Sequence, residues 1–124
     1  AYQAFGVGYG SYITIQNCYL QDIKATSTGA IYMGAFTDSN ANHITIQNNV
    51  FENIGGEMTS YLNHAIYISD HSSYVTVRYN LFEKCGGWSV HAYVHAYNSA
   101  IRHVSVYYNI FIFTPGFGAG GIER

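Results

Sequence analysis

The sequence predicts an all-β solenoid of about four turns, and three observations carry this prediction. One phrase occurs four times, at 13–20, 44–51, 75–82 and 104–111, where it reads ITIQNCYL, ITIQNNVF, VTVRYNLF and VSVYYNIF. Successive copies begin 31, 31 and 29 residues apart, and a nearly fixed period is typical of repeat architectures. Within each copy, β-branched apolar residues alternate with polar ones, which is the pattern of a strand.

Each position of the repeated phrase predicts where its side chain points or which structural role it has. Successive side chains of a strand point to opposite faces, so the aliphatic pair faces inward and the hydroxyl faces out. The inward pairs begin with Ile13 and Ile15, and the outward column is Thr14, Thr45, Thr76 and Ser105. An asparagine slot follows at Asn49, Asn80 and Asn109, where Cys18 takes the first place. Asparagine at a bend satisfies free backbone groups and bonds to its own kind along a stack, so these residues are predicted to be structural.

A second, fainter phrase alternates with the first. It reads GAIYM at 29–33, HAIYI at 64–68, SVHAY at 89–93 and GGIER at 120–124, and Ala4–Val7 looks like an incomplete opening copy. We expect one inward column made of Ile31, Ile66, Val90 and Ile122. Each repeat therefore contains two or three short strands that are joined by turns of variable length.

Winding each repeat once around an axis pairs its strands in parallel with those of the next turn, about 4.8 Å away. The inward Ile and Val columns then form one continuous core. Helical repeats are disfavoured because no segment sustains an apolar period of 3.6. A β-sandwich would show the sequence signals of hairpin turns rather than a phrase that repeats every 31 residues.

The phrase Ile-Thr-Ile-x-x-Asn-x-Phe, followed by Gly-Gly and then Gly-x-Ile-Tyr, resembles the repeat of the right-handed parallel β-helix of pectate-lyase-like proteins. The resemblance covers nearly the whole chain and implies fold more strongly than function, because this scaffold carries many activities. It implies an extracellular or cell-surface protein that binds or processes polysaccharide by lyase, epimerase or hydrolase chemistry. The Asp-Pro-His of mannuronan epimerases and the Arg-x-x-Arg of pectate lyases are absent from the sequence, so whether the protein is an enzyme stays open.

Composition narrows the classes of partner. The chain is 124 residues long, which fits one domain over 1–124, and it is 48% hydrophobic but only 10% charged. A net charge of −2 predicts no nucleic-acid partner, and no apolar run is long enough to predict a membrane span. Cys18 and Cys85 occupy different slots on different turns, so they are expected to be buried thiols rather than a disulfide or metal site. No cofactor is predicted.

The ends of the solenoid are predicted to be uncapped. Phe5 and Val7 stand almost at the start and Ile122 almost at the finish, with no amphipathic helix to cover either end. Two arrangements would cover them: further turns of a longer β-helix, or self-association end to end. The second arrangement defines the alternative function, a non-catalytic solenoid segment of a filament, tail spike or surface assembly.

Chemistry is predicted on the outer face of the second phrase. The residues that follow the inward column should form an outward column of Tyr32, Tyr67, His91 and Glu123, with His64, Asp70, His71, Tyr93 and His95 around it. Imidazole, phenol and carboxylate groups suit general acid–base work, so His91, Tyr67, Glu123 and His64 are the candidate catalytic residues. Two imidazoles on one strand face, His91 and His95, are too few for us to predict a metal site.

Aromatic side chains are the candidate substrate-binding residues, because flat rings suit a linear glycan. They are Tyr32, Tyr93, Trp88 and Tyr97. The competing interpretation is that these rings pack loops against the coil. The outward threonine column also resembles an ice-binding array, but Arg78 and Tyr107 interrupt the column beside it.

Overall fold

The computed structural model describes residues 2–25, 28–34, 40–55, 62–95, 97–112 and 118–123, with the backbone alone for residues 40 and 118–123. These described residues form thirteen strands and no helix. The strands are β1 (Phe5–Val7), β2 (Tyr9–Gln16), β3 (Tyr19–Gln21), β4 (Gly29–Met33), β5 (Asn40–Gln47), β6 (Val50–Ile54), β7 (His64–Ile68), β8 (Ser73–Arg78), β9 (Leu81–Cys85), β10 (Trp88–Tyr93), β11 (Arg102–Tyr107), β12 (Ile110–Ile112) and β13 (Gly118–Glu123).

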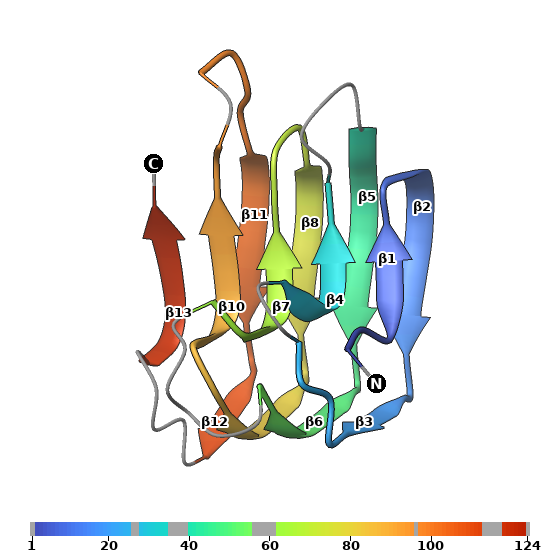
Figure 1. Ribbon diagram of the computed structural model, residues 1–124. Helices are drawn as coiled ribbons and strands as arrows, with labels where there is room; N and C mark the ends of the chain where they lie inside the picture. The colour runs from blue at the N-terminus through green and yellow to red at the C-terminus, as the bar shows by residue number, and fades with distance from the viewer. Residues whose placement is uncertain are drawn as a thin grey trace.

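Every third strand lies in the same sheet, so the chain winds as a coil with three parallel faces (Figure 1). Sheet A has the order β1-β4-β7-β10-β13, sheet B has β11-β8-β5-β2, and sheet C has β12-β9-β6-β3. All pairings between neighbouring turns are parallel. The predicted all-β solenoid of about four turns is therefore confirmed, and β1 is the predicted incomplete opening copy.

The four copies of the repeated phrase stack residue on residue. Thr14 pairs with Thr45, Thr45 with Thr76, and Thr76 with Ser105, so the copies share one register across sheets B and C. The inward aliphatic residues of the interior turns, Ile44, Ile46, Val75 and Val77, are fully buried between the three sheets. Phe51, Phe82 and Phe111 stack at 4.7 and 4.9 Å between ring centres. The core is thus a set of columns that run along the axis.

The asparagine column closes the bend between sheets B and C. Asn80 Nδ2 donates to the Ile46 carbonyl and to Asn109 Oδ1, while Asn80 Oδ1 accepts the Asn49 backbone N–H. The residue before each asparagine slot has φ between 53° and 58°, which turns the backbone sharply. The structural role predicted for these asparagines is confirmed, because the amides bond both to the bend and to one another.

One predicted alignment is wrong by two residues. Gly120 pairs with Val90, whereas Ile122 pairs with Ala92 and Glu123 pairs with Tyr93. A shift of two residues leaves the inward and outward alternation unchanged, so the hydrophobic pattern could not distinguish the two registers. The correction takes Glu123 out of the column of Tyr32, Tyr67 and His91, where Gly121 stands instead.

Candidate functional site

The predicted catalytic residues Tyr67, His91 and His64 lie together on strands β7 and β10 of sheet A. Tyr32, Tyr67 and His91 are in register on β4, β7 and β10, as predicted. The Tyr67 ring stacks on His91 at 5.2 Å, and His64 lies 4.3 Å from His91 between ring centres. We call this group, together with its neighbours, the sheet A cluster; it comprises Tyr32, His64, Tyr67, Asp70, Trp88, His91, Tyr93 and His95.

The column is more enclosed than the predicted outward face. Tyr67 is 7%, His91 5% and His64 1% exposed, so the exposed column that alternation predicted is in fact buried. Neighbouring rings account for part of the burial, because Trp88 and Tyr93 both contact His91. The sheet A cluster is a packed polar layer with a half-buried rim.

The two buried histidines hold one another in defined neutral tautomers. The Trp88 backbone N–H donates to His64 Nδ1, so the proton of neutral His64 lies on Nε2. His64 Nε2 is 3.0 Å from His91 Nδ1, which therefore accepts, and the proton of His91 lies on its own Nε2. Burial and then the neighbouring His91 lower the pKa of His64 to about 4, and burial and then His95 lower the pKa of His91 to about 4. Both imidazoles are neutral at pH 7.

Asp70 and His95, expected near the column, form a network with Tyr67. Asp70 is fully buried, and its two carboxylate oxygens bind the backbone N–H and Nδ1 of His95, each at 2.8 Å. On the other side of that ring, Nε2 lies 2.9 Å from the Tyr67 hydroxyl. A carboxylate accepts hydrogen bonds, so it holds the His95 proton on Nδ1 and leaves Nε2 to accept from Tyr67. The geometry is a carboxylate–imidazole–phenol chain.

The remaining predicted site residues divide into two groups. Tyr32 contacts Tyr67 at 5.6 Å, Tyr93 meets His95 edge-on at 4.5 Å, and Trp88 lies 4.5 Å from His91, so these three belong to the cluster. Tyr97 is 102% exposed, outside the cluster. The side chain of Glu123 lies outside the described residues.

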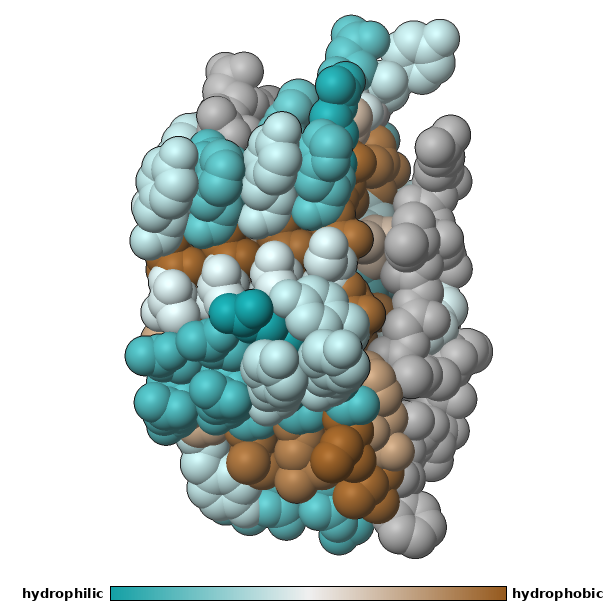
Figure 2. All heavy atoms as spheres, turned by 180° about the vertical axis from the view of Figure 1, so that it is seen from behind, coloured by the Kyte–Doolittle hydropathy of each residue, from teal (hydrophilic) through white to brown (hydrophobic). Residues whose placement is uncertain are grey.

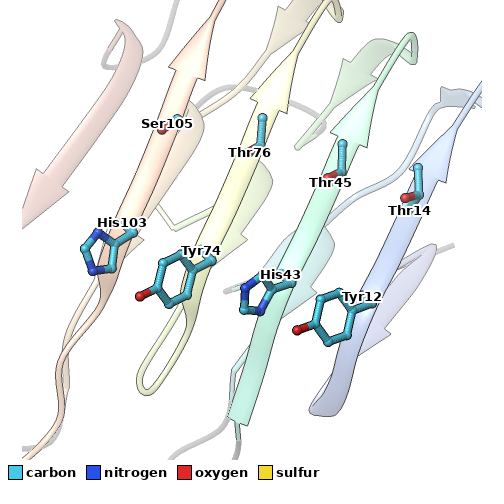
Figure 3. A pocket seen from close by; sticks show the side chains of 8 residues that line it. All are labelled: Tyr12, Thr14, His43, Thr45, Tyr74, Thr76, His103 and Ser105. Carbon is cyan, nitrogen blue, oxygen red and sulfur yellow. The ribbon is translucent and has the colours of Figure 1, made fainter.

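A second feature, on sheet B, was not predicted. Tyr12, His43, Tyr74 and His103 stack along the axis with ring centres 4.5, 4.7 and 4.4 Å apart. Beside them runs the threonine column, and the two rows enclose an open trough of about 490 Å³ (Figure 3). We call it the sheet B trough; it is lined by Tyr12, Thr14, His43, Thr45, Tyr74, Thr76, His103 and Ser105. The signal was in the sequence, since a Tyr or His stands immediately before every copy of the repeated phrase.

In the part of the chain that the structure describes, no three His, Cys, Asp or Glu side chains come close enough to hold a metal ion. No described helix is long and apolar enough to cross a membrane.

The chain matches the model of a family described as "Right handed beta helix region", over residues 1–121. No curated protein and no solved structure matched it. The matched region contains every residue of the sheet A cluster and of the sheet B trough.

Proposed function

Because the chain belongs to the right-handed β-helix family, we propose that it processes a polysaccharide by proton transfer at the sheet A cluster. The observation that carries the proposal is the Tyr67 hydroxyl, 2.9 Å from His95 Nε2, with Asp70 fixing the imidazole from behind. A buried carboxylate that orients a histidine toward a hydroxyl is a recurring way to activate that hydroxyl. We further propose that the protein works outside the cell or at its surface, where such polymers are found.

The chain of groups supports a defined path for a proton. His95 Nε2 accepts the Tyr67 phenol proton, and the resulting imidazolium is stabilised by Asp70. The phenolate then removes the proton next to a sugar carboxylate, which leaves a carbanion on the substrate. The carbanion expels the glycosidic oxygen in a lyase, or takes a proton on its other face in an epimerase.

The Tyr67–His95 pair supports the second half of such a reaction. It has gained one proton from the substrate, so the Tyr67 hydroxyl can return a proton to a leaving oxygen or to the carbanion while His95 gives its own proton back to Tyr67. His91 stacks on Tyr67 as a buried, neutral neighbour. Hydrolysis of glycosides normally needs two carboxylates that flank the bond. Among the side chains that the structure describes, the cluster contains one carboxylate, Asp70, which is fully buried and bonded to His95, and this favours lyase or epimerase chemistry over hydrolysis.

The rim of the cluster supports entry of a polymer from one side. Tyr32, Trp88 and Tyr93 are half-buried, and the His95 side chain is 28% exposed. These groups present aromatic surface beside the otherwise covered Tyr67. A sugar that lies over them brings its ring carbons toward the phenol oxygen.

The test follows alginate and polygalacturonate, both uronic-acid polymers, in deuterated water. A lyase produces a new double bond that absorbs ultraviolet light, and an epimerase incorporates solvent deuterium at the inverted carbon. Tyr67→Phe keeps the ring and removes the hydroxyl, so we expect at least about a 100-fold loss of rate. His95→Gln should lose a similar factor, and Tyr79→Phe, on an exposed tyrosine elsewhere, should lose none.

The proposal would be overturned if these polymers gave no ultraviolet absorbance and no deuterium incorporation, or if Tyr67→Phe kept full activity. Far-ultraviolet circular dichroism of each variant confirms that the fold is retained.

Exposed core-type side chains favour a second candidate, the structural solenoid segment. Val106 on β11 is 44% exposed, whereas its register partner Val77 is fully buried by the next turn. An open strand edge with apolar side chains is a template for another strand. Light scattering at rising concentration tests end-to-end association; the candidate requires a molar mass that grows with concentration and falls in Val106→Lys.

A further inference from the structure

We propose that the sheet B trough is a binding site for an uncharged, hydroxyl-rich linear polymer, a neutral polysaccharide chain lying along the solenoid axis. The site is separate from the sheet A cluster, because its lining comes only from β2, β5, β8 and β11. The inference therefore does not depend on the proposed proton-transfer chemistry. It rests on the two walls of the trough, on its floor and on its lack of charge.

The first wall of the trough is the row of four stacked rings, and the backbone of these four residues is strained. Tyr12, His43, Tyr74 and His103 have φ of 59°, 54°, 53° and 55°, in the left-handed region that bulky residues avoid. Such a conformation is unfavourable for a residue with a large side chain, and glycine or asparagine would adopt it more readily. The bends before the asparagine column carry Asn17 and Asn48 at similar φ, and Tyr79 and Tyr108 on the other two turns. In the trough, by contrast, all four turns place a ring at the strained position, and the four rings form one continuous stack.

Stacking determines which part of each ring a ligand meets. The planes of Tyr12 and His43 are 18° apart, and those of His43 and Tyr74 are 10° apart, so neighbouring rings occupy each other's faces. The edges stay open to solvent, and Tyr74 is 49% exposed. Along this wall the edges present phenol oxygens and imidazole nitrogens in alternation (Figure 3). These groups donate and accept hydrogen bonds in fixed positions.

The opposite wall is a row of hydroxyls in strict register. Thr14, Thr45, Thr76 and Ser105 occupy equivalent places on four successive turns. Figure 2 shows an apolar band between the row of rings and the row of small polar side chains. The trough is therefore apolar along its floor and polar along both rims.

That cross-section matches one class of ligand. A sugar ring carries apolar C–H faces and a periphery of hydroxyls, so it can cover the floor while its hydroxyls bond to both rims. No carboxylate, lysine or arginine lines the trough, so it holds no permanent charge to pair with that of a charged polymer. The lining continues unbroken over four turns, which suits an extended chain rather than a single small molecule. Because stacked rings and β-branched threonines are already rigid, binding loses little side-chain entropy.

The experiment titrates the whole chain with uncharged cello-, xylo-, manno- and chito-oligosaccharides by calorimetry and by nuclear magnetic resonance. We expect at least one of them to bind, with shifts centred on β2, β5, β8 and β11. Thr45→Val and Thr76→Val together keep the branched shape and remove two hydroxyls, so affinity should fall by at least about tenfold. Tyr74→Phe should fall several-fold, whereas Tyr79→Phe, on a tyrosine of nearly equal exposure outside the trough, should bind like the parent.

Three outcomes would overturn the proposal: no binding of any uncharged oligosaccharide, binding that Thr45→Val with Thr76→Val leaves unchanged, or preference for a charged oligogalacturonate or an extended peptide. Tyr67→Phe distinguishes the two proposals, since it should remove turnover at sheet A and leave binding in the trough intact. Retained binding without turnover would contradict only the proposed function, and turnover without binding in the trough would contradict only this inference.

Discussion

At the scale of single residues, the molecule depends on buried polar side chains that form hydrogen bonds from one turn to the next. Asn49 and Asn80 are 1% and 2% exposed, and each amide bonds to a bend and to the next amide. His64 and His91 are buried in the same way, neutral and bonded to each other. A buried polar side chain is tolerated because its groups are hydrogen-bonded. Removing one partner leaves the other group buried without a hydrogen bond, and the protein then bears the full desolvation penalty of that group.

Replacing Asn80 by alanine should therefore be costly. The Ile46 carbonyl and the Asn49 backbone N–H both lose their side-chain partner inside the bend. We expect a loss of about 3 kcal/mol in the free energy of unfolding, measured by urea denaturation. Gln47→Ala removes two side-chain hydrogen bonds on the outside of the coil, to Gln16 and from Arg78, and leaves no buried backbone group without a partner. It should cost less than about 1 kcal/mol, and a cost equal to that of Asn80→Ala would contradict this prediction.

The two buried histidines predict a pH-dependent stability. Their pKa is about 4 in the folded protein against the ordinary 6.5, so the unfolded chain binds protons first as the pH falls. Stability is complete above about pH 6.5 and is lost between pH 6.5 and 4, on the order of 1 kcal/mol for each histidine and pH unit. Urea titrations at pH 7 and 5 measure this loss. His91→Gln should flatten the dependence and His103→Gln, in the exposed trough, should not.

At the scale of elements, the strands of sheet B combine ordinary pleating with one left-handed residue each. Tyr74 has φ of 53° and stacks between His43 and His103 at 4.7 and 4.4 Å. Ring stacking is worth about 0.5–1.5 kcal/mol for each pair, which offsets the backbone strain. Sheet B is stable because stacking offsets the backbone strain in the same way in each of its four strands.

This balance reverses the usual ranking of alanine and glycine in a strand. Tyr74→Ala loses both stacks and keeps the strain, whereas Tyr74→Gly loses both stacks and relieves it. We expect the glycine variant to be more stable by about 1 kcal/mol in thermal or urea unfolding. At Thr76, two residues further along the strand, the glycine variant should be less stable than the alanine variant. The same order of stability at both positions would contradict the prediction that the left-handed φ of Tyr74 reverses it.

At the scale of the whole molecule, stability is a sum over turns and over the contacts between neighbouring turns. Phe82 packs between Phe51 and Phe111 and is fully buried, while Phe111 lies on the last turn of sheet C and is half-buried. The free energy of unfolding that is lost when a core side chain is truncated should therefore be larger in the interior turns than in the outer ones. Interior turns carry two interfaces and the outer turns carry one.

Phe82→Ala should lose about 3–5 kcal/mol, and Phe111→Ala clearly less, in equilibrium unfolding. Hydrogen exchange should agree, with slower amide exchange in β5, β6 and β8 than in β11 and β12. A uniform cost for both phenylalanines would mean that the solenoid does not unfold turn by turn in the way that its contacts indicate.

The sequence by itself determined the coil, its inward columns and the asparagine bend, because these depend on alternation and on a period that every copy repeats. It also brought Tyr32, Tyr67 and His91 into one column, since register follows from the same period. The register of β13 needed the tertiary structure, because a slip of two residues preserves every inward and outward choice. So did the Asp70–His95–Tyr67 chain and the burial around it, which join a loop to a strand of another turn. The stacked rings of the sheet B trough stood in the sequence at the repeat period, but only the left-handed backbone turned them to one side of the threonines.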